Sequence, residues 1–331
     1  MKTDILTEKH RLGLGGVAIG TAFENITDEQ AFDILQTAWD AGIRYYDTSP
    51  WYGLTKSERR FGNFLKNQDR NGFVFSTKVG RLFTEVPESE VPPTMWKNPL
   101  NYDFRHDYTA DAVKKSIEDS LKRTGLDHID IVYIHDLSED QVGDRYPYFL
   151  DQAKKGAFKV LSELRDQGVI KAWGMGVNKI EPILDCIESA DPDICLSATQ
   201  YSILDHEDAA DRLLPAVKKA GVKLVSGAGY NSGYIAGRER YNYKEVIPKG
   251  MEEKRERMRK IAKKYDTDIV HAALQFVLAA DEFASIIPGA GKPEQVRDNV
   301  EGLNTVIPPD FWNELKAEGL IYEKAQTPDY R

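Results

Sequence analysis

Residues 27–47, with the sequence TDEQAFDILQTAWDAGIRYYD, contain the pattern that decides the fold. Thr27 and Gln30 have the spacing of a capping box, which predicts the start of a helix, and apolar residues follow at helical spacing. Gly42 stands where a residue of left-handed conformation commonly ends a helix. The apolar run at residues 43–47 comes directly after it and predicts a strand. The stretch therefore predicts a helix, a glycine that ends it, and a strand.

The same order of helix, glycine and strand recurs at Gly125, Gly168 and Gly221, and Thr55 and Glu58 have the spacing of a second capping box. Strands are predicted at residues 17–20, 43–47, 72–78, 129–134, 169–175, 195–200, 222–228 and 284–288. Helices are predicted after Thr27 and at residues 55–65, 109–124, 153–167, 180–187, 208–219, 251–265 and 293–303. Eight strand–helix units are typical of an α/β fold, the (β/α)8 TIM barrel, and we expect residues 1–331 to form one such domain.

An open doubly wound sheet is the alternative, because residues 13–18, GLGGVA, match the GxGxxA pattern of dinucleotide-binding folds. Only twelve residues precede the pattern and no helix pattern starts there, so we expect a turn before a strand instead. Three long connections, at residues 80–107, 136–156 and 229–250, each follow a predicted strand. In a barrel such loops gather at the C-terminal face, where we expect them to form the rim of a substrate site.

The composition excludes several classes of protein. The 331 residues carry a net charge of −9, whereas a nucleic-acid partner would call for a basic face. Cys186 and Cys195 stand outside any CxxC pattern, so we expect neither a disulfide framework nor a metal site. Residues 1–11 are polar and no run of 18 apolar residues occurs, which favours a cytoplasmic location without a membrane span. We therefore expect a small-molecule substrate, no nucleic-acid or membrane partner, and a monomer or homodimer.

Titratable residues stand at the ends of three consecutive predicted strands. Asp47 ends the second strand, Lys78 ends the third and His135 stands at the end of the fourth, while Tyr52 lies five residues beyond Asp47. Packing alone would place valine or isoleucine at such positions, and an unpaired buried lysine or aspartate is costly. These side chains are therefore expected to pair at the C-terminal face of the barrel.

Together, Asp47, Tyr52, Lys78 and His135 resemble the catalytic tetrad of the aldo-keto reductase superfamily. Residues 41–49, AGIRYYDTS, are similar to its signature AGxxxxDTA, and the similarity extends from about residue 12 to residue 303. The resemblance implies an NAD(P)-dependent oxidoreductase in which hydride passes between nicotinamide C4 and a carbonyl or hemiacetal carbon. Tyr52 would be the general acid or base, Lys78 would favour its phenolate, and Asp47 would hold Lys78. His135 would bind and orient the substrate oxygen.

Two glycine-rich loops follow the last two predicted strands, GAGYNSG at residues 227–233 and GAGK at residues 289–292. Barrels commonly bind phosphate at these loops, and a helix N-terminus follows the second loop. The resemblance puts Asp298 and Asn299 at the adenine, and Gln295 where NADP-binding members have an arginine that grips the 2′-phosphate. We therefore expect NAD as cofactor, with NADP left open through Lys292 or Arg297.

The remaining cofactor candidates rest on looser matches. Asn178 stands one residue beyond the family's serine–asparagine pair, Gln200 two residues beyond its glutamine, and Tyr230 three residues beyond its stacking tyrosine. Gly289 replaces a lysine found in many members. The full set of expected cofactor-binding residues is Asn178, Gln200, Gly227, Tyr230, Asn231, Ser232, Gly233, Gly289, Gly291, Lys292, Gln295, Asp298 and Asn299.

Five segments resemble the branch of aldose 1-dehydrogenases and pyridoxal 4-dehydrogenases, which oxidise a cyclic hemiacetal to a lactone. They are SPWYG at residues 49–53, STKVGR at residues 76–81, DIVYIHD at residues 130–136, GVN at residues 176–178 and NSG at residues 231–233. The resemblance makes a sugar or another cyclic hemiacetal the expected substrate, flanked by Trp51, Arg81, Trp96 and Asp136. The alternative for the two tryptophans is that they only shield the pocket.

Three other functions stay open. The first is a general aldehyde or ketone reductase, and the second is a non-enzymatic cofactor-binding module on the same fold. The third is a lyase that forms a Schiff base through Lys78.

Overall fold

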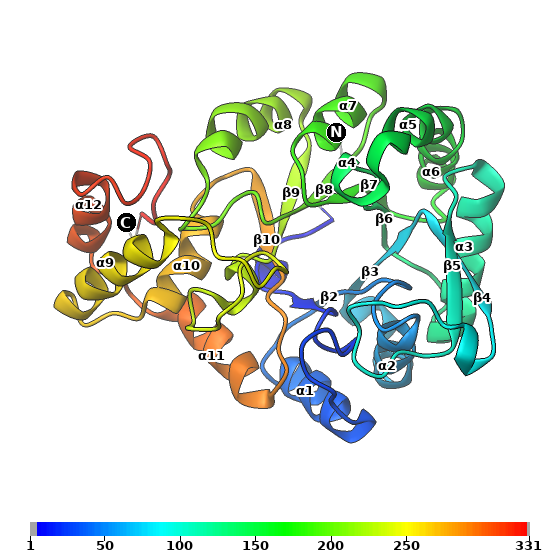
Figure 1. The fold of residues 1–331 in the computed structure, drawn as a ribbon, viewed down its shortest axis with the longest axis horizontal. Helices are drawn as coiled ribbons and strands as arrows, with labels where there is room; N and C mark the ends of the chain where they lie inside the picture. The colour runs from blue at the N-terminus through cyan, green and yellow to red at the C-terminus, as the bar shows by residue number, and fades with distance from the viewer. Residues whose placement is uncertain (1–4, 330–331) are drawn as a thin grey trace.

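The computed structural model describes residues 5–329, and its central feature is a sheet of eight parallel strands (Figure 1). In spatial order the strands are β1 (Leu14–Gly15), β2 (Tyr45–Asp47), β3 (Val74–Val79), β6 (Ile131–His135), β7 (Ala172–Val177), β8 (Ile194–Ala198), β9 (Lys223–Gly227) and β10 (Phe283–Ile286). Parallel bridges from Leu12 to Ile286 and from Gly15 to Gly289 join the first strand to the last. The predicted (β/α)8 barrel is therefore confirmed.

Helices connect the strands and lie around the outside of the sheet (Figure 1). They are α1 (Asp28–Asp40), α2 (Lys56–Leu65), α3 (Ala110–Thr124), α4 (Glu139–Val142), α5 (Tyr146–Lys155), α6 (Ala157–Asp166), α7 (Glu181–Ser189), α8 (Leu214–Ala220), α9 (Met251–Lys264), α10 (Ile269–Leu278), α11 (Pro293–Asn304) and α12 (Pro309–Ala317). Within residues 5–329, none of the helices combines the length and the apolar character that crossing a membrane requires.

The local signals that predicted the helix ends are largely confirmed. Thr27 Oγ1 accepts a hydrogen bond from the Gln30 backbone N–H, and the Gln30 side chain accepts one from the Thr27 N–H, which completes the capping box. The four glycines that follow helices have φ values between +66° and +86° (Gly42, Gly125, Gly168 and Gly221). A side chain would be strained in that conformation, so these glycines end their helices as predicted.

The prediction of a second capping box is wrong. Thr55 has a φ of +78° and its side chain caps no backbone N–H of α2. Glu58 is buried and accepts hydrogen bonds from Thr77 Oγ1 at 2.6 Å and Arg123 Nε at 2.6 Å instead. A buried carboxylate needs charged and polar partners, so tertiary contacts with β3 and α3 outweigh the local capping pattern.

Two predicted boundaries are also wrong. The first strand is Leu14–Gly15, because residues 16–20 form a turn in which the Gly20 N–H donates to the Gly16 carbonyl. The helix predicted at residues 153–167 is two helices, α5 and α6, that meet at Gly156. A Cβ on Gly156 would lie 2.7 Å from the Ala110 nitrogen, so this close approach to the start of α3 requires glycine.

The long connections contain elements that the sequence did not predict. Residues 80–107 include an antiparallel hairpin of β4 (Arg81–Glu85) and β5 (Tyr102–His106).

The sequence also does not predict the helix α10, which lies outside these connections. Nine of its ten residues are buried, which removes the polar face that marks a surface helix. The prediction of a single domain over residues 1–331 extends beyond the described residues and stays a prediction.

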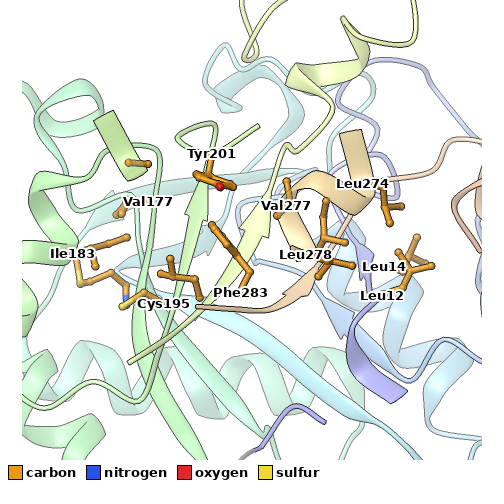
Figure 2. Packing of buried hydrophobic residues seen from close by; sticks show 14 of the residues in the cluster. Leu12, Leu14, Val177, Ile183, Cys195, Tyr201, Leu274, Val277, Leu278 and Phe283 are labelled. Carbon is orange, nitrogen blue, oxygen red and sulfur yellow. The ribbon is translucent and has the colours of Figure 1, made fainter. Parts of the chain in front are cut away.

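Two apolar layers support the carboxyl ends of the strands. In Figure 2, Ile183 of α7 and Leu274 of α10 are among the side chains that pack between the helices and the outer face of the sheet. A second cluster, with members such as Tyr45, Tyr133 and Val225, comes from alternate residues of neighbouring strands and fills the barrel interior. The interior is thus a packed base, and the space available to a ligand lies at the strand ends.

Candidate active site

A buried ion pair joins the ends of β2 and β3. Lys78 Nζ lies 2.7 Å from Asp47 Oδ2 and donates a second hydrogen bond to the Thr48 carbonyl at 2.9 Å. Asp47 Oδ1 accepts a hydrogen bond from Ser76 Oγ at 2.7 Å. The side chains of Lys78 and Asp47 are 1% and 2% exposed, so the pair depends on these mutual contacts for its charge. The pairing expected from the sequence is formed.

Tyr52 follows β2 and lies against this pair. The Lys78 ammonium nitrogen is 4.7 Å from the centre of the Tyr52 ring. Burial, followed by the negative charges of Asp47 and Asp136, raises the pKa of the Tyr52 phenol well above its ordinary value. Lys78 directs its hydrogen bonds to Asp47 and Thr48, and the expectation that it favours the phenolate stays a prediction. Tyr52 is a neutral phenol, the form that can donate a proton.

His135 ends β6, and its ring meets the edge of the Tyr52 ring with centroids 5.7 Å apart. Its Nδ1 lies 3.0 Å from Ser49 Oγ and 3.3 Å from Arg81 Nη1. Arg81 Nη2 in turn donates to Asp136 Oδ2 at 3.0 Å. Burial and the cations Arg81 and Lys78 lower the pKa of His135 well below its ordinary value, so its imidazole is neutral.

One cavity connects this chemistry to the glycine-rich loops. All four tetrad candidates line it, as does Asp136, and so do eleven of the expected cofactor residues: Asn178, Gly227, Tyr230, Ser232, Gly233, Gly289, Gly291, Lys292, Gln295, Asp298 and Asn299. Gln200 and Asn231 are not on its wall. Gln200 donates to the Asn178 carbonyl at 2.8 Å, and Asn231 donates to Asn242 Oδ1 at 3.0 Å, so each supports a neighbouring segment.

Three of the four expected substrate residues lie behind the cavity wall. Trp51 packs edge-on against Trp96 and Phe104, with ring centroids 5.7 Å and 4.7 Å apart. Trp96 also contacts the Tyr52 ring, and the Arg81 guanidinium lies over Trp51. Trp51, Arg81 and Trp96 are absent from the cavity lining within the described part of the chain. This arrangement favours the shielding role that the sequence left open for the two tryptophans.

The loop at residues 229–250 brings four side chains to the cavity that the sequence analysis missed. They are Ala236 and the larger polar or charged Arg238, Arg240 and Tyr243. Arg240 donates to the Ser232 carbonyl at 2.7 Å and its guanidinium lies 3.8 Å from the centre of the Phe23 ring. Tyr243 stacks on the same ring, with centroids 6.5 Å apart. The length of the loop predicted a rim, but no local pattern tells which of its residues turn inward.

The lining residues fit a dinucleotide. Three cationic side chains, Arg238, Arg240 and Lys292, line the cavity and can meet a pyrophosphate. Lys292 also stands at the N-cap of α11, whose N-terminus favours an anion. Tyr230 donates to Asn299 Oδ1 at 2.8 Å, which leaves the Asn299 amide N–H groups for acceptor nitrogens of a base.

The comparisons with known proteins identify the family of this chain. The model of the aldo/keto reductase family matches residues 11–318. The chain belongs to this family. Its relatives include a pyridoxal 4-dehydrogenase from Microbacterium luteolum, 36% identical, and a D-threo-aldose 1-dehydrogenase from a Pseudomonas species, 35% identical. Each alignment covers 94% of this chain and 94% of the relative.

A solved aldo-keto reductase, AKR11C1 from Bacillus halodurans in its holo form, has the same fold as this aldo/keto reductase. The TM-score is 0.71 at 23% identity, over 97% of this chain and 94% of the other. Membership of the family confirms the predicted superfamily and makes the protein an NAD(P)-dependent oxidoreductase. The lyase and the non-enzymatic module are not supported by these relatives.

Proposed function

We propose that this aldo/keto reductase oxidises a cyclic hemiacetal, most simply that of an aldose, to its lactone with NAD. The observation that carries the proposal is the position of Asp136, which lines the cavity with Oδ2 3.6 Å from His135 Nε2. A carboxylate beside a group that binds the reacting oxygen fits a substrate with a second hydroxyl next to its reacting carbon. The D-threo-aldose 1-dehydrogenase at 35% identity supports the same class of substrate.

In this proposal Tyr52 and His135 hold the oxygen on the reacting carbon. Oxidation requires the hydroxyl proton to leave, and Tyr52 takes it once its own phenol has lost a proton. In the reverse direction the neutral phenol donates a proton to the carbonyl oxygen. Asp47 and Lys78 fix the ring and the local charge around it. A bound nicotinamide supplies the hydride acceptor for oxidation and the hydride donor for reduction.

The preference for NAD rests on Gln295. Its Oε1 accepts a hydrogen bond from the Gly291 N–H at 2.8 Å, so the side chain holds the loop before α11. A neutral amide cannot give a 2′-phosphate the charged fork that an arginine would. An Escherichia coli relative, 29% identical, is named an NADH-specific methylglyoxal reductase, which supports a non-phosphorylated cofactor.

Pyridoxal is a second candidate substrate, favoured by a specific feature of the cavity. Phe23 and Tyr243 stack on each other and both line it, which gives an aromatic wall suited to a flat ring. The pyridoxal 4-dehydrogenase at 36% identity supports this candidate. Both candidates share one reaction, the conversion of a hemiacetal to a lactone.

A substrate panel tests the proposal. Aldoses of different configuration and pyridoxal are each given to the purified protein with NAD or with NADP. Methylglyoxal is given with the reduced cofactor, and absorbance follows the reduced nicotinamide in every case. We expect oxidation of at least one hemiacetal with a higher kcat/KM for NAD than for NADP. Reduction of simple aldehydes alone, with no oxidation of any hemiacetal, would refute it. Tyr52→Phe is the matched control, because it removes only the hydroxyl group.

The setting of this activity is also a proposal. We place the enzyme in the cytoplasm, which suits its two buried cysteines, neither of which takes part in a disulfide. We further propose that it works as a monomer or homodimer on a small molecule.

A further inference from the structure

A chain of hydrogen bonds runs from the cavity wall to His135 through a side chain that does not line the cavity. Asp136 Oδ2 accepts from Arg81 Nη2 at 3.0 Å, and Arg81 Nη1 lies 3.3 Å from His135 Nδ1. We propose that Arg81, held by Asp136, is a positioning residue that fixes His135 as the tautomer with its proton on Nε2. The proposal rests on the carbonyl chemistry of the family and is independent of which substrate is used.

The direction of each hydrogen bond decides the tautomer. A guanidinium donates and never accepts, so His135 Nδ1 must be the acceptor in its contact with Arg81. Ser49 Oγ accepts from the Trp51 backbone N–H at 3.0 Å, which leaves its own proton free to point at Nδ1, 3.0 Å away. With Nδ1 acting as an acceptor, the single proton of a neutral imidazole resides on Nε2.

The position of Arg81 is set by its surroundings. Its side chain is 4% exposed, and its guanidinium lies 4.9 Å from the centre of Trp51 and 5.9 Å from that of Phe104. The preceding residue, Gly80, has a φ of +110°, and a Cβ there would lie 2.4 Å from the Tyr108 ring. The chain therefore enters β4 in a conformation that only glycine adopts without strain, and this sets where Arg81 begins.

The backbone of His135 is fixed from the same side. The Tyr108 hydroxyl donates to the His135 carbonyl at 3.2 Å. The charged and titratable groups that face the imidazole are Arg81, Lys78, His106, Asp136 and Tyr52. Two of these groups, Arg81 and Lys78, are cations, and their positive charge disfavours a second proton on the imidazole ring. Nε2 is then a neutral donor, 3.6 Å from Asp136 Oδ2, which is beyond hydrogen-bonding distance.

A direct role for Arg81 in substrate binding makes a different prediction. If its guanidinium held substrate hydroxyls, its loss would raise KM for a polyhydroxylated substrate and spare a simple aldehyde. If it positions His135, its loss lets the imidazole adopt the other tautomer, whose Nε2 lone pair would face the substrate oxygen. Turnover of every substrate would then fall, because part of the enzyme molecules would lack the Nε2–H donor of His135.

The kinetic test uses Arg81→Met, which keeps the length of the side chain without its donors, and Arg81→Lys, which keeps a cationic donor. Arg105→Met is the control, since Arg105 lies in the same hairpin with 65% of its side chain exposed. We expect kcat of Arg81→Met to fall roughly 10- to 100-fold for methylglyoxal and for any hydroxylated substrate alike, with little change in KM. Arg81→Lys should recover part of this loss. A rise in KM confined to hydroxylated substrates, with kcat unchanged, would overturn the proposal.

A spectroscopic test does not depend on turnover. In 15N-labelled protein the shifts of the two ring nitrogens distinguish the tautomers, and His135→Ala assigns the signal among the six histidines. Wild type should show an unprotonated Nδ1, whereas Arg81→Met should add a population with the proton on Nδ1 and an unprotonated Nε2. A proton on Nδ1 in wild type would refute the tautomer, whether or not the enzyme oxidises hemiacetals.

Discussion

The ammonium group of Lys78 lies over the Tyr52 ring, 4.7 Å from its centre, while Asp47 and Thr48 accept its hydrogen bonds. A cation over the ring face attracts the π-electrons of tyrosine and holds the ring in place. The phenol proton is retained, because burial and two neighbouring carboxylates raise the pKa of Tyr52. The protonation state of Tyr52 therefore sets a different pH dependence for the two directions of the reaction.

The first prediction concerns that pH dependence. Because the pKa of Tyr52 is raised, the neutral phenol dominates at neutral pH and is lost only as the pH rises through that elevated value. Carbonyl reduction, which uses the phenol as an acid, should stay level through neutral pH and fall in alkali. Hemiacetal oxidation, which uses the phenolate, should increase with pH. Profiles of kcat/KM in both directions check this, and a reduction rate that increases with pH would contradict it.

The second prediction concerns the buried ion pair. Asp47→Asn or Lys78→Met leaves one buried charge without its partner, so each should lower the free energy of unfolding by about 3–5 kcal/mol. The double variant removes both charges and should lose less than the sum of the single losses. Urea denaturation followed by tryptophan fluorescence measures all three. Additive losses would mean that the two charges do not depend on each other.

The third prediction concerns Tyr243, whose ring stacks on Phe23 in the cavity. Burial, followed by smaller effects of Tyr52 and Asp136, raises the pKa of its phenol, so Tyr243 is a neutral donor near the tetrad. Tyr243→Phe removes that donor and keeps the stack. We expect kcat/KM to fall about 5-fold for a hydroxylated substrate, the effect of one lost hydrogen bond, and to stay unchanged for methylglyoxal. An equal fall in kcat/KM for both substrates would mean that the Tyr243 hydroxyl does not recognise a substrate hydroxyl group.

The fourth prediction concerns cofactor choice. Gln295→Arg introduces the charged fork that a 2′-phosphate needs, and should raise kcat/KM for NADP relative to NAD roughly 10-fold. The variant also loses the hydrogen bond from the Gly291 N–H. Gln295→Leu loses the same bond without adding a charge, so it separates the two effects. If both variants change the ratio of kcat/KM for NADP to that for NAD equally, the loop and not the added charge sets the cofactor preference.

The sequence predicted the barrel and the pairing of the tetrad because their signals are local. A capping box, a glycine of positive φ and an alternating strand each depend on a few neighbouring residues, and strand ends meet at one face by the topology of parallel sheets. It failed where a local pattern competes with distant partners. Thr55 and Glu58 have the spacing of a capping box, yet Glu58 bonds Thr77 and Arg123 instead.

The wall of the cavity shows the same limit. Arg81 and Trp51 have residue types suited to a sugar site, but Arg81 lies over Trp51 and, among residues 5–329, neither lines the cavity. Tyr243 reaches the cavity from a loop without a recognisable pattern. Which side chain faces a ligand depends on how the loops fold over the strand ends, and a single sequence carries no signal for that.

By itself, the sequence determined the eight strand–helix units of the barrel, the family, and the four tetrad residues at or just beyond successive strand ends. Tertiary structure alone decided the protonation of Tyr52 and the partners of His135, since burial and the distance between charges set both. It also decided that Arg81 supports His135 from behind the cavity wall. The physical reason is that electrostatic and hydrogen-bonding states depend on distances between groups far apart in the chain, and folding creates those distances.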